Sequence, residues 1–388
     1  MFNLIKKKPT LLRVTTVPQS LWKLLEGQLA FMTQYYNVHA VSSAGEKLEI
    51  VKEREGVSTH SIEMYRGISI VRDFKSIWKL YRYIKKIKPD IIHSHTPKAG
   101  LIAMVSAKMA KVPVRLHTVA GMPLESTKGI KRQILISVEK LCYHFAHKIY
   151  PNSLGLKEFI IKNKLAPTSK LRVVASGSSN GIDLDYFDIH DCVIEQSKSI
   201  RDQYFHEDDF IFGFIGRLVK DKGVNELVKA FLSLELPNAK LMLLGKYEDH
   251  LDPLLPEVRE EIEKNKNILF VGYQKDVRPY LVAMDVFVFP SHREGLPNVL
   301  LQAAAMGKPI VASNCNGNTD IIIHKQNGIL VNVNDQKALE EQMLNLFNSK
   351  ELRDRYSVSV RKNIEKRYKR EVVWESLREE YSSHLKKL

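Results

Sequence analysis

Residues 291–302 read Ser-His-Arg-Glu-Gly-Leu-Pro-Asn-Val-Leu-Leu-Gln, and they decide the fold because of what lies on either side of them. The apolar run 285–290 predicts a short buried strand, residues 298–306 predict a helix, and residues 308–313 predict the next strand. Strand, loop, helix and strand in this order form one βαβ unit of a parallel sheet. The loop therefore follows the carboxyl end of a strand, which is the edge where open α/β sheets bind ligands.

The loop carries a carboxylate and the following helix carries an amide. Glu294 is followed by Gly295 and then by the expected start of the helix, whose free backbone N–H groups favour anions. Gln302 stands eight residues after Glu294, which is about 12 Å along a helix. That length is similar to the separation of the sugar and the ribose in a nucleotide-sugar. A carboxylate can bond sugar hydroxyls at one end, and an amide can bond a ribose diol at the other.

This stretch resembles the Glu-x7-Glu motif of family-4 retaining glycosyltransferases, which have the GT-B fold. In that family the first glutamate contacts the donor sugar and the second contacts the ribose hydroxyls, so the resemblance implies these roles for Glu294 and Gln302. Glutamine can bond a diol, but without the assistance of a charge. The alternative is an ordinary surface loop with a solvated glutamate. The further donor-binding residues that the resemblance implies here are Gly295, Leu296, Pro297 and Asn298.

A second motif, Gly-Arg-Leu-Val-Lys-Asp-Lys-Gly at residues 216–223, follows an apolar strand and precedes a helix. Arg217 and Lys222 stand five residues apart on the expected turn, so both cations can converge on one anion, while Gly216 and Gly223 allow a sharp turn. Two fixed cations suit a diphosphate that gains charge as it leaves. The motif resembles the Gly-Arg-x4-Lys-Gly phosphate motif of the same family. A solvated basic turn is the alternative.

Two weaker motifs lie near these. Residues 270–277 resemble the strand end beside the nucleotide base in the same family. The resemblance implies that Gly272, Tyr273 and Gln274 contact the base through backbone groups or by stacking, although Tyr273 can equally be a packing residue. Residues 316–320 resemble the loop that shapes the cleft in that family.

The acceptor side of the family's site corresponds to the first half of this chain. Residues 90–100 resemble the strand-to-helix turn on that side, and they place His95 and Lys98 at the turn. Many relatives carry a histidine or an acidic residue at the position of Ala120. His117 is therefore the nearest candidate for the polar catalytic group of this half, and a structural role for His117 is the alternative.

Composition and charge limit the possible partners. The 388 residues, 44% of them hydrophobic, suffice for two domains. The first 183 residues hold 30 lysines and arginines against 12 acidic residues, whereas the rest of the chain holds 29 against 32. Such an excess indicates an anionic membrane face, an acidic substrate or nucleic acid, and we expect no nucleic-acid partner because no corresponding motif occurs. Three cysteines without metal-ligand spacing favour a reduced compartment, and we expect neither a signal peptide nor a spanning helix.

Strands alternate with helices along the chain, which predicts parallel sheets covered by helices on both faces. We expect residues 1–183 to form an acceptor-binding Rossmann-like domain and residues 184–366 a Rossmann-like domain that binds the nucleotide-sugar. The family resemblance adds that the two domains face each other across a cleft, and that a helix within residues 367–388 returns to the first domain.

Four local expectations concern the secondary structure. Residues 20–32 predict one helix, residues 171–174 predict a strand, and the polar segment 181–208 predicts an irregular linker. Residues 74–87 predict a basic helix whose apolar stripe faces the core, although Trp, Tyr and Lys together also suit an anionic bilayer, to which residues 128–148 would add. The stripe comprises Phe74, Ile77, Trp78, Tyr81 and Ile84.

Together the motifs predict a retaining glycosyltransferase that moves a hexose or N-acetylhexosamine from a nucleotide-sugar, expected to be UDP-linked, to a glycan acceptor. The expected catalytic residues are Glu294, Arg217, Lys222 and His117. No cofactor and no obligate metal are expected, because the two cations stabilise the departing diphosphate.

The basic first half suggests an acceptor saccharide on a polyprenyl diphosphate, as in bacterial capsule or O-antigen synthesis. We therefore expect a cytoplasmic protein, held peripherally at the inner face of the membrane. Two alternatives remain: a binding or regulatory protein on a degenerate glycosyltransferase scaffold, which Gln302 and Ala120 favour, and a nucleotide-sugar epimerase of the same fold.

Overall fold

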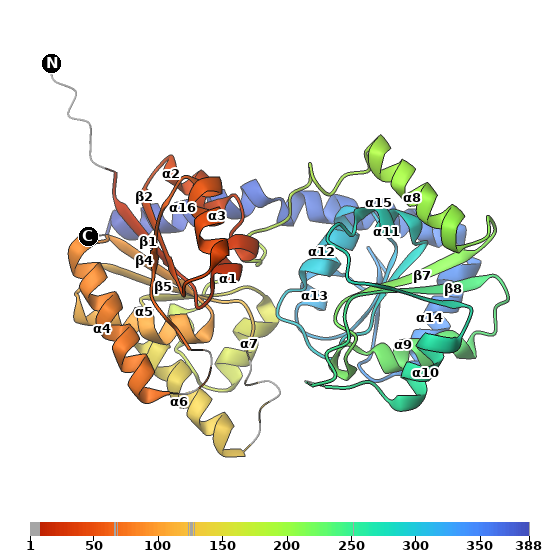
Figure 1. The fold of residues 1–388 in the computed structure, drawn as a ribbon, viewed down its shortest axis with the longest axis horizontal. Helices are drawn as coiled ribbons and strands as arrows, with labels where there is room; N and C mark the ends of the chain where they lie inside the picture. The colour runs from red at the N-terminus through yellow and green to blue at the C-terminus, as the bar shows by residue number, and fades with distance from the viewer. Residues whose placement is uncertain are drawn as a thin grey trace. The chain divides into compact units, whose positions relative to one another are not determined.

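The structure is a computed structural model that describes residues 8–387 except 66, 68, 123, 125, 126, 128 and 251. The chain forms two compact units (Figure 1): unit 1 comprises Met1–Gly181 with Arg370–Leu388, and unit 2 comprises Ile182–Lys369. Each unit contains a parallel six-stranded sheet with flanking helices. The two sheets confirm the predicted α/β class with two Rossmann-like halves.

Unit 1 is built on a sheet with the strand order β3-β2-β1-β4-β5-β6. Its strands are β1 (Thr10–Val14), β2 (Asn37–Ser42), β3 (Ser58–Ser61), β4 (Ile91–His95), β5 (Val114–Val119) and β6 (Lys148–Pro151). Its helices are α1 (Pro18–Leu24), α2 (Gln28–Thr33), α3 (Glu46–Glu55), α4 (Ile70–Ile87), α5 (Pro97–Met109), α6 (Gly129–Phe145), α7 (Leu154–Lys162) and α16 (Arg370–Leu385), with a 3-10 turn at Thr168–Lys170.

Alternate residues of the strands in unit 1 enter two separate cores, as the period of a strand requires. Leu12 packs in a core with α4, α5 and α6, whereas its neighbour Leu11 packs in a core with α1, α2 and α16. The last helix thus belongs to the first unit. Its residue Tyr381 is completely buried, accepts a hydrogen bond from Nη1 of Arg13 at 2.7 Å, and lies 2.6 Å from Nδ1 of His93.

Unit 2 is built on a sheet with the strand order β12-β11-β10-β7-β8-β9 around one large core. Its strands are β7 (Phe210–Ile215), β8 (Ala239–Leu244), β9 (Ile268–Gly272), β10 (Val286–Phe289), β11 (Ile310–Ser313) and β12 (Ile329–Val331). Its helices are α8 (Asp191–Tyr204), α9 (Val224–Ser233), α10 (Pro256–Lys264), α11 (Arg278–Ala283), α12 (Asn298–Ala305), α13 (Asn318–Ile321), α14 (Gln336–Asn348) and α15 (Lys350–Tyr368), with a 3-10 turn at Lys220–Lys222.

Three of the local expectations were wrong. The expected helix 20–32 is two helices, because Gly27 adopts φ 75° and the carboxylate of Glu55 accepts from the N–H groups of Gly27 and Ala30. The expected strand 171–174 is reduced to one bridge, between Ile149 and Leu171. The expected linker 181–208 contains α8, whose buried residues Val193 and Ser197 lie one helical turn apart.

The fourth expectation, that the apolar stripe of α4 faces the core, was partly wrong. Leu80 and Ile84 are buried, but Phe74 is 67% exposed and Trp78 is 50% exposed. The helix also begins at Ile70, four residues earlier than expected. Lys128, in the second segment expected to contact a membrane, lies outside the described residues. None of the helices in the described ranges is long and apolar enough to cross a bilayer.

Candidate functional site

The two expected donor motifs lie together at the carboxyl edge of the sheet in unit 2. The turn 216–223 follows β7 and the loop 290–297 follows β10. These two strands are neighbours in the sheet although β8 and β9 separate them along the chain. The strand order reverses at this point, and open α/β sheets bind ligands in the crevice at such a switch point.

An ion pair joins the two motifs. Nζ of Lys222 donates to Oε1 of Glu294 at 2.5 Å, and the two residues are 72 positions apart in the sequence. Only 15% of the lysine side chain and 11% of the glutamate side chain are exposed. Water screens such a pair only weakly, because both side chains are largely buried. The structure thus brings Lys222 and Glu294 to one place.

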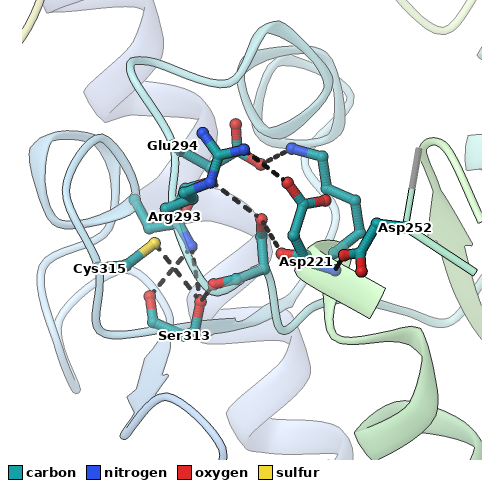
Figure 2. Close-up of polar contacts among 9 residues, drawn as sticks. Asp221, Asp252, Arg293, Glu294, Ser313 and Cys315 are labelled. Carbon is teal, nitrogen blue, oxygen red and sulfur yellow. Dashed lines mark hydrogen bonds and ion pairs between the residues drawn. The ribbon is translucent and has the colours of Figure 1, made fainter. Parts of the chain in front are cut away.

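A second set of contacts holds the loop against the turn, and Asp221 is at its centre (Figure 2). The Asp221 carboxylate accepts from Nη2 of Arg293 at 2.9 Å, and its backbone carbonyl accepts from the N–H of His292 at 2.9 Å. On its other side, the N–H of Asp221 donates to the Asp252 carboxylate at 2.8 Å. Asp221 and Arg293 were missed in the sequence, although each stands beside a predicted site residue and carries a charge opposite to the other.

The loops approach each other so closely that two positions admit only glycine. Gly223 has φ 69°, and a Cβ atom there would lie 2.1 Å from the carbonyl oxygen of Pro290. Gly317 has φ 79°, and its Cβ would lie 2.5 Å from the carbonyl oxygen of Gly295. Both positions exclude side chains by conformation and by space.

The loop after β11 completes the wall beside Glu294. The hydroxyl of Ser313 donates to the carbonyl of Ser291, and the Asn318 amide donates to the carbonyl of Ser313 at 3.0 Å. Burial raises the pKa of the nearby Cys315 thiol to about 11. This cysteine is therefore a neutral thiol at physiological pH rather than a thiolate nucleophile.

Arg217 is paired with a different carboxylate from the one that Lys222 contacts. Its Nη1 donates to Oε2 of Glu248 at 3.0 Å, in a pair whose side chains are 42% and 31% exposed. Glu248 follows β8, so it comes from a different strand than Glu294. Each of the two cations is thus paired with its own carboxylate, and their convergence on one anion stays a prediction. A pair as exposed as Arg217 and Glu248 is weak and easily exchanged for a ligand.

The other predicted donor residues surround this pair of loops. Gly216 directly follows β7 and donates its N–H to the carbonyl of Leu244, while Leu296 is 8% exposed near the end of the loop 290–297. Pro297 is the N-cap residue of α12 and Asn298 its first residue, so the helix presents its amino end toward the loop. Gln302 lies one turn further along, partly exposed.

The residues expected beside the base lie at the carboxyl end of β9, the next strand but one from β7. Gly272 adopts φ 79° and accepts a hydrogen bond from the N–H of Gly245 at 2.9 Å. The ring of Tyr273 is 55% exposed, with the ammonium of Lys246 at 5.0 Å from its centre. It is therefore a surface ring rather than a core residue, and Lys246 lies over one of its faces. Gln274 donates its amide to the carbonyl of Val271 at 3.4 Å.

The three residues expected on the acceptor side belong to unit 1, and the structure places them in buried contacts. His117 is 1% exposed, its Nδ1 lies 2.9 Å from the Ser94 hydroxyl, and its ring packs against Gly100. Burial lowers its pKa to about 4. His117 therefore belongs to the packing between β5 and α5, which favours the structural role given above as the alternative over a catalytic one.

His95 and Lys98 are also engaged within the unit. His95 is 1% exposed, and its Nε2 lies 2.5 Å from Nη2 of Arg13, a buried guanidinium. Burial, followed by the charge of Arg13, holds the pKa of His95 well below its usual range. Its ring lines a cavity of about 20 Å³, room for about one water molecule. Lys98 pairs with Asp73 of α4 at 2.6 Å, with 14% of each side chain exposed.

Comparison with known proteins adds sequence relatives along the whole chain. The family described as "Glycosyl transferases group 1" matches residues 196–363, and the "Glycosyl transferase 4-like domain" matches residues 33–177. The capsular polysaccharide biosynthesis glycosyltransferase CapM of Staphylococcus aureus is 34% identical over 98% of both chains. The UDP-Gal:alpha-D-GlcNAc-diphosphoundecaprenol alpha-1,3-galactosyltransferase of Escherichia coli is 30% identical over 74% of both chains.

A solved structure shares the fold. HepE of Anabaena, crystallised in complex with UDP, superimposes with a TM-score of 0.81 over 96% of this chain and 100% of that chain, at 17% identity. The resemblance at this identity concerns the fold.

Proposed function

We infer that this chain, which belongs to the family-4 glycosyltransferases of the GT-B fold and of the bacterial capsule and O-antigen type, transfers a hexose or N-acetylhexosamine from a UDP-sugar with retention of configuration. That it is a glycosyltransferase follows from its membership of the family. The donor, the stereochemistry and the acceptor are our proposal. The Escherichia coli relative, whose name specifies UDP-galactose and a diphosphoundecaprenol-linked acceptor, supports the choice of both substrates.

The observation that carries the donor proposal is the meeting of Lys222 and Glu294 at the switch point of unit 2. A UDP-sugar offers a diphosphate to the cation and sugar hydroxyls to the carboxylate. Lys222 is then released to the diphosphate, and Glu294 is released to the hydroxyls. Each group keeps a charge-assisted hydrogen bond when it exchanges its partner, so the exchange is not costly. Arg217 makes a similar exchange from Glu248 to the diphosphate.

The reaction breaks the bond between the anomeric carbon of the sugar and the oxygen of the β-phosphate. Negative charge grows on that oxygen, and Lys222 and Arg217 stabilise it where it develops. The sugar ring becomes positive, and Glu294 orients it through its hydroxyls. Attack by the acceptor hydroxyl on the face that the diphosphate leaves retains the configuration, and the acceptor proton passes to the departing phosphate oxygen.

The acceptor in this proposal is a saccharide on a polyprenyl diphosphate, and the protein works while bound to the inner face of the cytoplasmic membrane. The excess of 30 basic over 12 acidic residues in the first 183 residues supports an anionic surface as the partner. The names of relatives that act on diphosphoundecaprenol-linked acceptors support the carrier.

A donor screen tests the proposal. The purified protein is incubated with UDP-, GDP-, ADP- and dTDP-sugars, with and without saccharides on polyprenyl diphosphate, and nucleoside diphosphate release is followed together with the mass of the lipid product. We expect release of UDP that depends on the acceptor, and a product with the anomeric configuration of the donor by NMR. An inverted anomer contradicts retention. Conversion of the donor without an acceptor indicates an epimerase, and no turnover of any donor indicates a binding protein.

Removing divalent metal ions is expected to leave the transfer rate unchanged. In the proposed site Lys222 and Arg217 supply the positive charge that a metal ion supplies to a departing diphosphate elsewhere. The initial rate is measured in EDTA and again after Mg²⁺ or Mn²⁺ is added back. A rate that falls at least tenfold in EDTA and recovers with the metal would contradict metal independence.

Replacing Gln302 by glutamate is expected to tighten binding of the UDP-sugar about tenfold. A carboxylate accepts both hydroxyls of a ribose diol in charge-assisted hydrogen bonds, which are roughly twice as strong as neutral ones. Isothermal calorimetry measures the affinity for the UDP-sugar and for its 2′-deoxy analogue. The gain should vanish with the 2′-deoxy donor, and an equal gain for both donors would place Gln302 away from the ribose.

Replacing Arg293 by alanine is expected to raise the KM for the donor about tenfold with a smaller change in kcat. Arg293 contacts Asp221 rather than the proposed substrate, so it positions the loop that carries Glu294 against the turn that carries Lys222. Lysine at 293 should recover part of the loss, since it keeps the charge beside Asp221. A matched control is Arg259→Ala on α10, whose side chain is 41% exposed against 42% for Arg293 and pairs with Asp249, outside the proposed site. An unchanged KM would show that the Arg293 contact does not order the loop.

A further inference from the structure

Unit 1 exposes an apolar strip on the first two turns of α4. Ile70, Val71, Phe74 and Trp78 are 84%, 68%, 67% and 50% exposed. Residues at these spacings lie on one side of a helix. Soluble surfaces carry scattered apolar side chains, but four large ones in nine residues form a continuous strip.

A second exposed apolar strip lies on α6. Ile130, Ile134 and Leu141 are 82%, 40% and 44% exposed, at spacings that again place them on one side of the helix. The helix α5 contacts both α4 and α6, so the three helices lie side by side on one face of the sheet (Figure 1). We call the exposed residues of α4 and α6 named here the apolar edge.

The topology places most of the apolar edge at the carboxyl edge of the sheet. Helix α4 connects β3 to β4 and helix α6 connects β5 to β6, and all of these strands are parallel. In such connections the helix begins where the preceding strand ends. Ile70 to Trp78 and Ile130 to Ile134 are the first turns of their helices, so they lie beside the strand ends where open α/β sheets take their ligands.

Basic side chains accompany the apolar edge. Lys75, Lys79 and Arg82 are exposed on α4 at spacings of four and three residues, next to the strip that contains Phe74 and Trp78. The one acidic residue of α4, Asp73, is already paired with Lys98 at 2.6 Å. The first turns of α4 are therefore both apolar and positively charged, with an aromatic pair of Trp78 and Tyr81 whose ring centres lie 5.3 Å apart.

We propose that the apolar edge is a membrane-docking surface that inserts Phe74 and Trp78 into the headgroup region of an anionic bilayer, with Lys75, Lys79 and Arg82 on lipid phosphates. Apolar and aromatic residues beside a basic stripe are the combination that lies in a membrane interface. A second protein chain on this surface would leave Lys75, Lys79 and Arg82 without partners unless that chain were acidic. An anionic bilayer offers hydrocarbon to the apolar side chains and phosphates to the basic ones. This inference rests on the proposed function in one respect: the lipid-linked acceptor would reach the protein at the carboxyl edge of the sheet in unit 1, beside the docking surface.

Vesicle flotation tests the docking surface without any donor or acceptor, so its result is independent of the proposed reaction. The full chain is expected to float with vesicles that contain phosphatidylglycerol and to stay behind with phosphatidylcholine vesicles, and salt should weaken the binding. Phe74→Ser with Trp78→Ser should lower the partition coefficient about 100-fold, and Lys75→Gln with Lys79→Gln about 30-fold.

Matched substitutions on exposed positions of unit 2 are the controls. Val358→Ser with Tyr204→Ser removes two apolar side chains that are 55% and 48% exposed, and Lys362→Gln with Lys366→Gln removes two exposed charges of α15. None of these four changes should alter flotation by more than about twofold. Equal losses in the control and the α4 variants would overturn the assignment of the surface.

Tryptophan fluorescence locates the contact. Brominated phosphatidylglycerol should quench the tryptophan emission of the native chain. The Trp78→Phe variant should still float with the vesicles, but its emission should no longer be quenched. Retained quenching would mean that a different part of the chain enters the lipid, and it would overturn the proposal. A second result would also overturn the proposal: a native chain that sediments as a dimer, and a Phe74→Ser/Trp78→Ser variant that sediments as a monomer but floats normally. The apolar strip would then be a contact between copies of the chain.

The link to the reaction is tested separately with two acceptors that carry the same saccharide. The Phe74→Ser/Trp78→Ser variant should turn over a water-soluble short-chain acceptor normally and a vesicle-embedded acceptor at least tenfold more slowly. Equal rates on both acceptors would separate membrane docking from catalysis and would overturn that link. If no donor is turned over by any variant, the proposed function fails while flotation still decides the surface.

Discussion

Replacing Lys222 by alanine is expected to lower kcat about 10²- to 10³-fold, because removing one preorganised charge from a developing oxyanion has effects of that size. The loss should appear in kcat more than in the KM for the donor, since the charge on the β-phosphate oxygen grows in the transition state. Stopped assays of UDP release with saturating donor measure kcat. Lys222→Arg keeps the charge and should recover part of the rate.

The alanine variant also leaves Glu294 without its partner, so stability must be separated from catalysis. Glu294 is only 11% exposed, and an unpaired carboxylate there lowers the melting temperature. Adding Glu294→Gln to Lys222→Ala should restore the melting temperature but not kcat. The control is Lys220→Ala, an exposed lysine of the same 3-10 turn, which should keep its rate. A Lys222→Ala enzyme with nearly normal kcat would exclude Lys222 as the leaving-group cation.

Replacing Glu294 by glutamine is expected to lower kcat/KM for the UDP-sugar about 10²- to 10³-fold, because charge-assisted hydrogen bonds to the sugar hydroxyls become neutral ones. Free UDP should respond in the opposite direction. Oε1 of Glu294 lies 2.5 Å from Nζ of Lys222, so this carboxylate competes with a phosphate of UDP for the lysine. Replacing the carboxylate by a neutral amide should therefore leave the affinity for UDP unchanged or increase it. Calorimetry with UDP and with the UDP-sugar measures both affinities.

This opposite response separates two roles for the glutamate. If Glu294 only stabilises the loop, the affinities for UDP and for the UDP-sugar should fall together. If it binds the sugar, only the UDP-sugar loses affinity. Glu257→Gln on α10, a largely exposed carboxylate, is the control and should change neither affinity.

The sequence predicted the sheet of unit 2 well because its strands are short apolar runs that only a buried sheet accommodates. Val286–Phe289 and Ile310–Ser313 lie where the pattern placed them. The pairing of β10 with β7 also follows from the expected fold, and it brings the two motifs together. What the pattern could not supply is which carboxylate each cation meets. Arg217 forms an ion pair with Glu248, a residue that belongs to none of the motifs.

The error on α4 arose because the apolar side chains cover a wider arc of the helix than the arc that packs against the core. On an ideal helix Phe74 and Trp78 lie roughly 120° and 160° around the axis from Leu80, the centre of the buried face. The apolar stripe therefore extends past the core onto the free side, and periodicity alone does not mark where contact ends. For His117 the sequence left a catalytic and a structural role open, because periodicity alone does not show that its face of β5 is covered by α5 and that its ring meets the Ser94 hydroxyl.

The return of α16 to unit 1 has a consequence for the order in which the chain folds during synthesis. Unit 2 is one continuous segment, so all of it is synthesised before residue 370. Unit 1 must wait for α16, because the buried side chains of Arg13 and His93 share the hydroxyl of Tyr381 as one of their hydrogen-bond partners. The half that is translated first is thus completed last. A chain that stops before α16 would contain all of unit 2 and a first unit with an uncovered core, which is the kind of surface that chaperones bind.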